Sequence, residues 1–184
     1  VVVDESFMDF SGADSLAEES VKSDKLIVLN SMTKFYGIPG LRLGYLVAHG
    51  KTVERSNKHK EPWSVNVLAQ RIGSACLKDN AFCVRTRQFV SRERHYLYTQ
   101  LNAIGGMKAY DSSANFLLSK IVKNGLTSTE VYNALAREGI LIRDCRSFKG
   151  MGTKFIRLAV KQRKQNNRLI KALKSIVGGV KRAS

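Results

Sequence analysis

The chain has 184 residues, of which 43% are hydrophobic, and it carries a net charge of +16. A chain of this length can bury the core of one or two globular domains. No apolar run approaches the roughly 20 residues that a membrane-spanning helix needs, so no membrane partner is expected. The cysteines and histidines lack the spacing of metal ligands, and no metal site is predicted. These residues are Cys76, Cys83, Cys145, His49, His59 and His95.

The N-terminal part of the chain alternates predicted strands with predicted helices. Strands are expected near residues 1–4, 26–30 and 41–48, and helices near 51–60, 65–79 and 81–104. The last helix has an apolar stripe formed by Cys83, Val90, Leu97, Leu101 and Ile104, and Gly105 and Gly106 end it. This order of elements indicates an α/β fold.

The C-terminal part is predicted to form a compact second unit. Strands are expected at residues 115–121, 140–143 and 154–160, and helices at 128–138 and 163–177. Thr127 and Glu130 have the spacing of a capping box, and Gly139 is a typical helix stop. We therefore predict a domain of residues 1–104, which includes the linking helix, and a smaller domain of residues 105–184.

Positive charge is concentrated at the C-terminal end, where residues 161–184 hold eight basic and no acidic side chains. A basic helix can bind nucleic acid or an anionic membrane surface through its charge. An apolar stripe at helical spacing runs along the same segment, however, so the basic residues are more simply interpreted as the exposed side of a docked helix. The stripe consists of Leu169, Ile170, Leu173, Ile176 and Val177. No nucleic-acid partner is expected.

Two motifs in the first part of the chain carry candidate chemistry, and each follows a predicted strand. The first strand ends in Asp4, which taken alone is typical of an acidic cap. The second strand ends at Ser31, and Lys34 and Arg42 follow within a compact loop. A lysine held in a pocket loses its proton more readily than one in water, as Schiff-base formation requires. Ser31 and Arg42 are suitable donors to a phosphate. Taken alone, a lysine near glycines is more simply interpreted as a solvated loop residue.

Two arginines interrupt otherwise apolar strands in the second unit, at positions 143 and 157. A charge among buried strand residues is costly unless it is paired. Arg143 and Arg157 are therefore expected to face a ligand anion or a carboxylate, for example that of Asp144.

The run from Ser31 to Tyr45 resembles the pyridoxal-phosphate enzymes of the aspartate aminotransferase superfamily, whose motif places a lysine three residues after a serine and an arginine eight residues later. The resemblance implies pyridoxal-phosphate fold type I, with part of the large-domain sheet followed by a small C-terminal α/β domain. It also implies that Lys34 binds pyridoxal 5'-phosphate covalently, that Asp4 contacts the ring nitrogen, and that Ser31 and Arg42 bind the cofactor phosphate.

The same resemblance assigns roles in the second unit. Arg157 matches the arginine that binds the substrate α-carboxylate, and Arg143 matches one near the substrate phosphate. The implied partner is thus a small phosphorylated amino acid. Asn115 also matches a family position, although a turn at the start of a strand explains it equally well.

Within the superfamily, three segments are similar to the threonine-phosphate decarboxylases of cobalamin biosynthesis, and the histidinol-phosphate aminotransferases are close relatives. The segments are residues 4–10, 33–45 and 62–66. Phe7, where aminotransferases usually have tyrosine, and Trp63 favour decarboxylation of L-threonine O-3-phosphate. A histidinol-phosphate-type aminotransferase is the alternative, and a basic nucleic-acid-binding module is a third hypothesis.

The resemblance covers the whole chain but only the C-terminal half of a family member. The chain starts in a strand without an initiator methionine, so we expect that a preceding segment has been cut away and that the fragment alone is inactive. The family is dimeric, which implies a homodimer at full length. The odd number of cysteines and the absence of a signal-like start are compatible with the cytoplasm.

Overall fold

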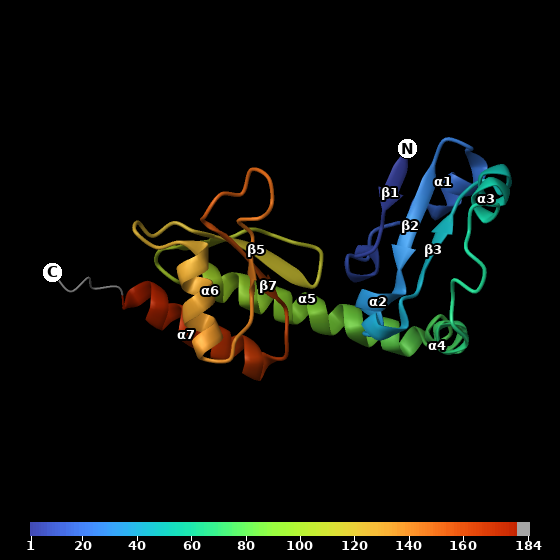
Figure 1. Cartoon of the computed structure of the whole chain (residues 1–184). Helices are drawn as coiled ribbons and strands as arrows, with labels where there is room; N and C mark the ends of the chain where they lie inside the picture. The colour runs from blue at the N-terminus through green and yellow to red at the C-terminus, as the bar shows by residue number, and fades with distance from the viewer. Residues whose placement is uncertain (180–184) are drawn as a thin grey trace. The chain divides into compact units, whose positions relative to one another are not determined.

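The computed structural model describes residues 1–179, which form two compact units, one ending at Gln88 and the other starting at Phe89 (Figure 1). Helix α5 (Asn80–Asn102) contributes residues to both units, so the division falls inside this helix. The boundary predicted from the sequence lies after residue 104, beyond the end of this helix. The division into a domain of residues 1–104 and a domain of residues 105–184 stays a prediction. No helix of the described residues is long and apolar enough to cross a membrane.

The first unit contains a three-stranded sheet in the order β1 (Val2–Asp4), β2 (Ile27–Ser31), β3 (Gly44–Val47). β1 and β2 are parallel, with Asp4 opposite Leu29, whereas β2 and β3 are antiparallel, with Ser31 opposite Gly44. A side chain at position 44 has no room, because its Cβ would lie 2.8 Å from the backbone oxygen of Asn30. Since β1 and β2 are parallel, their carboxyl ends lie at the same edge of the sheet.

Short helical elements surround this sheet. They are η1 (Met8–Phe10), α1 (Ala17–Lys22), α2 (Met32–Phe35), η2 (Pro39–Leu41), α3 (Gly50–Asn57), α4 (Val67–Cys76) and the first part of α5. The sequence did not predict η1, α1, α2 or η2, because segments of three to six residues give no helical periodicity. Phe35 forms an aromatic cluster with Phe10, at 5.1 Å between ring centroids, and with Phe82, at 6.2 Å. Arg87 of α5 donates from Nε to the backbone oxygen of Asp9 at 2.9 Å.

The second unit contains a four-stranded sheet in the order β4-β5-β7-β6, in which every neighbouring pair is antiparallel. Its elements are β4 (Met107–Ala109), β5 (Phe116–Ile121), α6 (Ser128–Arg137), β6 (Arg143–Asp144), β7 (Phe155–Ala159) and α7 (Arg163–Gly178). Leu117, Ile156 and Leu158 point from one face into a core shared with α5, α6 and α7. Because side chains alternate along a strand, the intervening residues lie on the opposite face.

The helix signals in this unit are confirmed. Thr127 Oγ1 accepts a hydrogen bond from Glu130 N, while the Glu130 carboxylate accepts one from Thr127 N, which completes the predicted capping box. Gly139 has the positive φ of +70° that a helix stop requires. On α7, Leu169, Ile170, Leu173 and Val177 are buried and Ile176 is partly buried, so this basic segment is a docked helix. Lys181 and Arg182 lie outside the described residues.

A buried carboxylate fixes the start of α7 on α5. Glu93, which is 3% exposed, accepts hydrogen bonds from Arg163 Nε at 2.9 Å, from Arg163 Nη2 at 3.1 Å and from Asn166 Nδ2 at 3.3 Å. The Arg163 guanidinium also lies 3.6 Å from the ring centroid of Tyr96. The hydrogen bonds from Arg163 hold the pKa of Glu93 below its usual value, although burial acts in the opposite direction. Glu93 is therefore ionised, and both of its carboxylate oxygens accept hydrogen bonds from α7.

Removal of the Arg163 side chain should lower the free energy of unfolding by about 2 kcal/mol, because two hydrogen bonds to a buried charge are lost. Arg92 is the matched control, since its Nε lies 3.4 Å from the same carboxylate but its side chain is 67% exposed. Arg92→Ala should cost less than about 1 kcal/mol. Urea unfolding of Arg163→Ala and Arg92→Ala measures both effects, and equal losses would contradict this interpretation.

The same carboxylate predicts a pH dependence. Because the pKa of Glu93 is lowered in the folded state, its contribution to stability is complete above the unfolded glutamate pKa of about 4.3 and is lost as pH falls through the lower folded pKa. Glu93→Gln should therefore be less stable than wild type at neutral pH but lose less stability on acidification below about pH 4.3. Unfolding free energies across this range test the prediction. Glu54→Gln, at an exposed carboxyl, should keep the wild-type profile.

Candidate active site

The amine of Lys34 is positioned at the carboxyl end of β2. Lys34 lies in α2, which directly follows this strand (Figure 1). Its Nζ donates a hydrogen bond to Ser31 Oγ at 3.1 Å. The same hydroxyl lies 2.8 Å from Thr33 Oγ1. The amine also lies over the ring of Phe7, 5.6 Å from its centroid. Lys34 itself is exposed, so the residues of this chain alone do not supply the desolvation expected from the sequence.

Asp4 lies at the end of the neighbouring parallel strand. Its Oδ1 accepts a hydrogen bond from the backbone N of Ser6 at 2.9 Å. The hydrogen bonds from Ser6 hold the pKa of the Asp4 carboxyl below its usual value, and the positive charge of Lys34 acts in the same direction. The structure thus brings an ionised carboxylate and a lysine amine to one sheet edge, within reach of each other's charge.

Arg42 follows η2 in an unusual backbone conformation. Its φ of +53° lies in the left-handed region, which non-glycine residues rarely adopt and which is enriched at functional sites. Its Nη1 donates to the backbone oxygen of Pro39 at 3.0 Å. Among the described residues no hydrogen bond joins Arg42 to Ser31 or Lys34. The contact with Pro39 therefore holds Arg42 within its own loop. The Nε and Nη2 atoms of its guanidinium take no part in this contact.

Arg143 and Arg157 are direct neighbours across β6 and β7, where the register places them opposite each other. The expectation that they lie among buried residues is wrong, because both are exposed and the strand alternation turns Ile156 and Leu158 to the core instead. The Arg157 guanidinium lies 4.8 Å from the ring centroid of Phe116. Two like charges directly opposite each other destabilise a sheet, so the pair favours a bound anion.

The suggested ion pair between Arg143 and Asp144 is also not formed. Asp144 instead accepts hydrogen bonds from Ser128 Oγ and Thr129 Oγ1, each at 2.8 Å, and its carboxylate lies 3.6 Å from Arg146 Nε. Burial acts to raise the pKa of Asp144. The hydrogen bonds that its carboxylate accepts from the backbone N of Arg146, from Thr129 and from Ser128 outweigh this effect and hold the pKa below its usual value. The carboxylate of Asp144 is thus occupied by hydrogen bonds from α6, and among residues 1–179 no ion pair joins Arg143 or Arg157 to a carboxylate.

Arg143 has two close neighbours that the sequence did not reveal. Its Nη2 donates to Ser147 Oγ at 3.1 Å, and its guanidinium lies 5.3 Å from the ring centroid of Phe148. The cross-strand alternation of β5 and β7 could have identified Phe116 beside Arg157, whereas loop contacts such as that of Ser147 carry no periodic signal. Arg143 and Arg157 belong to the second unit, whereas Lys34 and the candidate residues around it belong to the first.

Two further residues singled out in the sequence, Trp63 and Asn115, have local roles in the structure. The side chain of Trp63 is 98% exposed, and its backbone has a positive φ of 55°. The backbone oxygen of Asn115 accepts a hydrogen bond from Val160 N at 2.9 Å, at the start of β5. Among residues 1–179, no cluster of three or more His, Cys, Asp or Glu side chains could hold a metal ion.

The sequence matches the aminotransferase class I and II family over residues 1–173, and the chain belongs to this family. The family consists of pyridoxal-phosphate-dependent enzymes, so the cofactor predicted from the sequence is confirmed at the level of the family.

Named relatives and solved structures agree with this assignment. The chain is 34% identical to the threonine-phosphate decarboxylase of Salmonella typhimurium, over 98% of this chain and 49% of that protein. The histidinol-phosphate aminotransferase of Clostridium acetobutylicum superposes with a TM-score of 0.91 at 29% identity, over 97% of this chain and 54% of that one. The L-threonine-O-3-phosphate decarboxylase of Porphyromonas gingivalis superposes with a TM-score of 0.87 at 28% identity, over 96% and 55%.

These matches confirm the predicted α/β class and fold type I. The chain spans about half the length of the relatives that it matches.

The side chains at the β1–β2 edge fit pyridoxal phosphate in their chemistry. Lys34 offers an amine for a covalent bond to an aldehyde, and Asp4 offers an ionised carboxylate for a protonated ring nitrogen. Ser31 and Arg42 offer a hydroxyl and a guanidinium for a phosphate.

The arginine pair predicts an anion-dependent stability. Inorganic phosphate should raise the thermal unfolding midpoint, because it neutralises two opposed guanidinium groups. Arg143→Gln and Arg157→Gln should each weaken this binding about tenfold, which is the effect of one lost charge-assisted pair. Phosphate titrations followed by thermal unfolding measure the change. Lys149→Gln, at an exposed cation of the same unit, should behave as wild type, and a full phosphate response in both arginine variants would contradict the prediction.

Proposed function

We propose that the full-length protein is a pyridoxal-phosphate-dependent decarboxylase that converts L-threonine O-3-phosphate to (R)-1-amino-2-propanol O-2-phosphate. The observation that carries the proposal is the Lys34 amine 3.1 Å from Ser31 Oγ, at the sheet edge that also bears Asp4. The 34% identity to a named threonine-phosphate decarboxylase supports the choice of reaction.

The first-unit residues have separable tasks in this reaction. Ser31 and Arg42 bind the cofactor phosphate, and the ionised Asp4 keeps a proton on the ring nitrogen. When bound, pyridoxal phosphate supplies an electron sink for the bond broken at the substrate Cα. Lys34 first holds the cofactor and then, once released, is the amine that can carry a proton to or from Cα.

The second-unit arginines bind the two anionic groups of the substrate. Arg157 takes the α-carboxylate and Arg143 the phosphate, since both guanidinium groups face the exposed side of one sheet. Decarboxylation breaks the bond between Cα and the carboxylate carbon, carbon dioxide leaves, and a proton takes its place. The arginines orient the substrate, and this orientation decides whether the carboxylate or the Cα proton is lost.

A histidinol-phosphate-type aminotransferase is the second candidate. It is favoured by the TM-score of 0.91 to such an enzyme, whereas Phe7 in place of the usual tyrosine favours the decarboxylase. We also propose that the full-length protein is a homodimer, acts in cobalamin biosynthesis and resides in the cytoplasm. These proposals rest on the resemblance to the decarboxylase branch.

Incubation of the full-length protein with pyridoxal phosphate and L-threonine O-3-phosphate should release carbon dioxide. Lys34→Ala should lower this rate at least about a hundredfold and abolish the visible absorbance of the bound cofactor, because covalent attachment and proton transfer are both lost. Lys51→Ala, at an exposed lysine of α3, is the control and should stay active.

The products decide between the two candidates. Carbon dioxide without a keto acid supports the decarboxylase, while amino transfer from L-histidinol phosphate without carbon dioxide supports the aminotransferase. An unchanged cofactor absorbance in Lys34→Ala would overturn both.

A further inference from the structure

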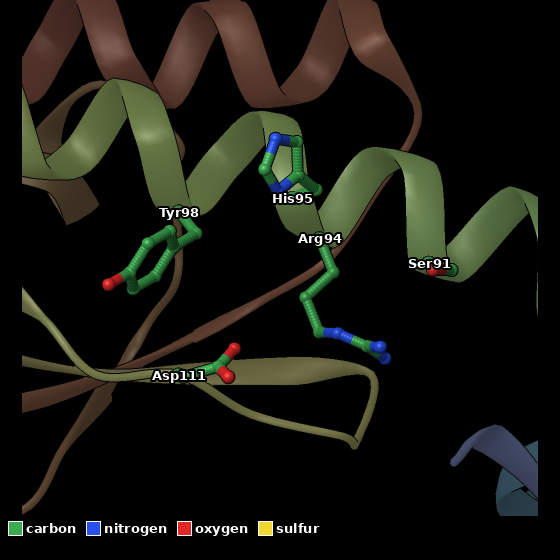
Figure 2. Close-up of a pocket in the computed structure, with 5 residues that line it drawn as sticks. All are labelled: Ser91, Arg94, His95, Tyr98 and Asp111. Atoms are coloured by element: carbon green, nitrogen blue, oxygen red, sulfur yellow. The ribbon is translucent and has the colours of Figure 1, made fainter. Parts of the chain in front are cut away.

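The second unit contains a polar hollow that the proposed reaction does not use. It has a volume of about 310 Å³ and lies between one side of α5 and the segment that follows β4 (Figure 2). Its lining consists of Ser91, Arg94, His95, Tyr98 and Asp111. The first four residues are spaced by three, one and three positions, so they share one side of the helix.

Hydrogen bonds fix both walls of the hollow. Arg94 Nη1 donates to the backbone oxygens of Ser113 at 2.9 Å and Ala114 at 3.1 Å, which ties the loop to the middle of α5. At the end of the helix, Asn102 Oδ1 accepts a hydrogen bond from Ala109 N at 2.9 Å. The loop therefore crosses α5 between two anchors, and the hollow is part of the folded unit.

The hollow presents charges of both signs that do not neutralise each other. Figure 2 shows the Asp111 carboxylate directed toward the helix, from which Arg94 extends. Among the described residues no ion pair joins these two side chains, and no described hydrogen bond uses Arg94 Nε or Nη2. Within residues 1–179, the one described hydrogen bond to Asp111 Oδ1 comes from its neighbour Ser112 N, at 2.8 Å. A guanidinium edge and a carboxylate are thus both available to a ligand.

Hydroxyl and imidazole groups complete the lining. Within residues 1–179 the Ser91 hydroxyl, the His95 ring and the Tyr98 hydroxyl take part in no described hydrogen bond. These groups can donate to or accept from a polar ligand side chain. A simple anion would face the Asp111 carboxylate, and a simple amine would face the Arg94 guanidinium, so neither complements the whole lining.

We propose that this hollow binds a small zwitterion of the α-amino acid class. Its carboxylate contacts Arg94, its ammonium contacts Asp111, and a polar side chain lies beside Ser91 and Tyr98. The volume of about 310 Å³ is at the small end of ligand pockets and suits a single amino acid. The site is separate from the residues assigned to catalysis and does not rest on the proposed function.

L-Serine is the probe, and its two truncated forms separate the charges. Ethanolamine lacks the carboxylate and 3-hydroxypropionate lacks the ammonium. Calorimetric titration of the full-length protein should show saturable binding of L-serine. Each truncated compound should bind about tenfold more weakly or worse, because one charge-assisted hydrogen bond is missing. Ligand-induced shifts of the Tyr98 and His95 NMR signals locate the binding.

Variants test the two charges separately. Arg94→Gln and Asp111→Asn should each weaken L-serine binding about tenfold, while Arg137→Gln and Asp24→Asn, at exposed positions, should not. Asp111→Asn leaves the Arg94 loop contacts intact, so it reports on binding even where Arg94→Gln disturbs the fold. Lys34→Ala should keep the Tyr98 and His95 shifts, which distinguishes this site from the candidate active site.

Three results would overturn the proposal. They are no saturable L-serine binding, equal binding of either truncated compound, and unchanged binding in Asp111→Asn. Loss of decarboxylase activity alone does not bear on it.

Discussion

The parallel pairing of β1 with β2 is the constraint on which the candidate active site depends. Its register sets Asp4 opposite Leu29, so Ser31 and Lys34 follow at the same sheet edge. The backbone of Glu5 continues the pairing by donating to Leu29 O at 2.8 Å, and its buried carboxylate accepts hydrogen bonds from Ser15 Oγ and Leu16 N. The connection between the two strands is thereby anchored directly after Asp4, the candidate cofactor-binding carboxylate. An antiparallel arrangement would have placed Asp4 at the opposite edge from Lys34.

A second constraint is the division of the C-terminal sheet into a buried and an exposed face. Helices α5, α6 and α7 cover the face that carries Leu117, Ile156 and Leu158. The other face carries the opposed Arg143 and Arg157, each beside an aromatic ring. Aromatic faces attract cations without neutralising them. They therefore hold the guanidinium groups in position and leave their charge available to an anion.

Residues with a periodic or local signal could be predicted from the sequence. The capping box of α6, the apolar stripe of α7 and the strand that ends at Ser31 each follow from spacing alone, and the structure has them. The burial of Arg143 and Arg157 was predicted wrongly, because apolar neighbours on both sides do not reveal which face of a strand is covered. Asp144 was misassigned for a related reason: its partners, Ser128 and Thr129, are distant in sequence. The charge-bearing hollow beside α5 depends on a loop crossing, which no periodicity encodes.

The position of Arg143 depends on Asp144 more than on the strand that contains it. β6 has only two residues, and a strand this short gains little stability from its own ladder. Because Asp144 accepts hydrogen bonds from two hydroxyls at the start of α6, it anchors β6 to a helix that is itself docked in the core. A slip of one residue would turn Arg143 toward the buried face and separate it from Arg157. The Asp144 anchor prevents this slip, so a buried-side carboxylate maintains the cationic pair on the exposed side.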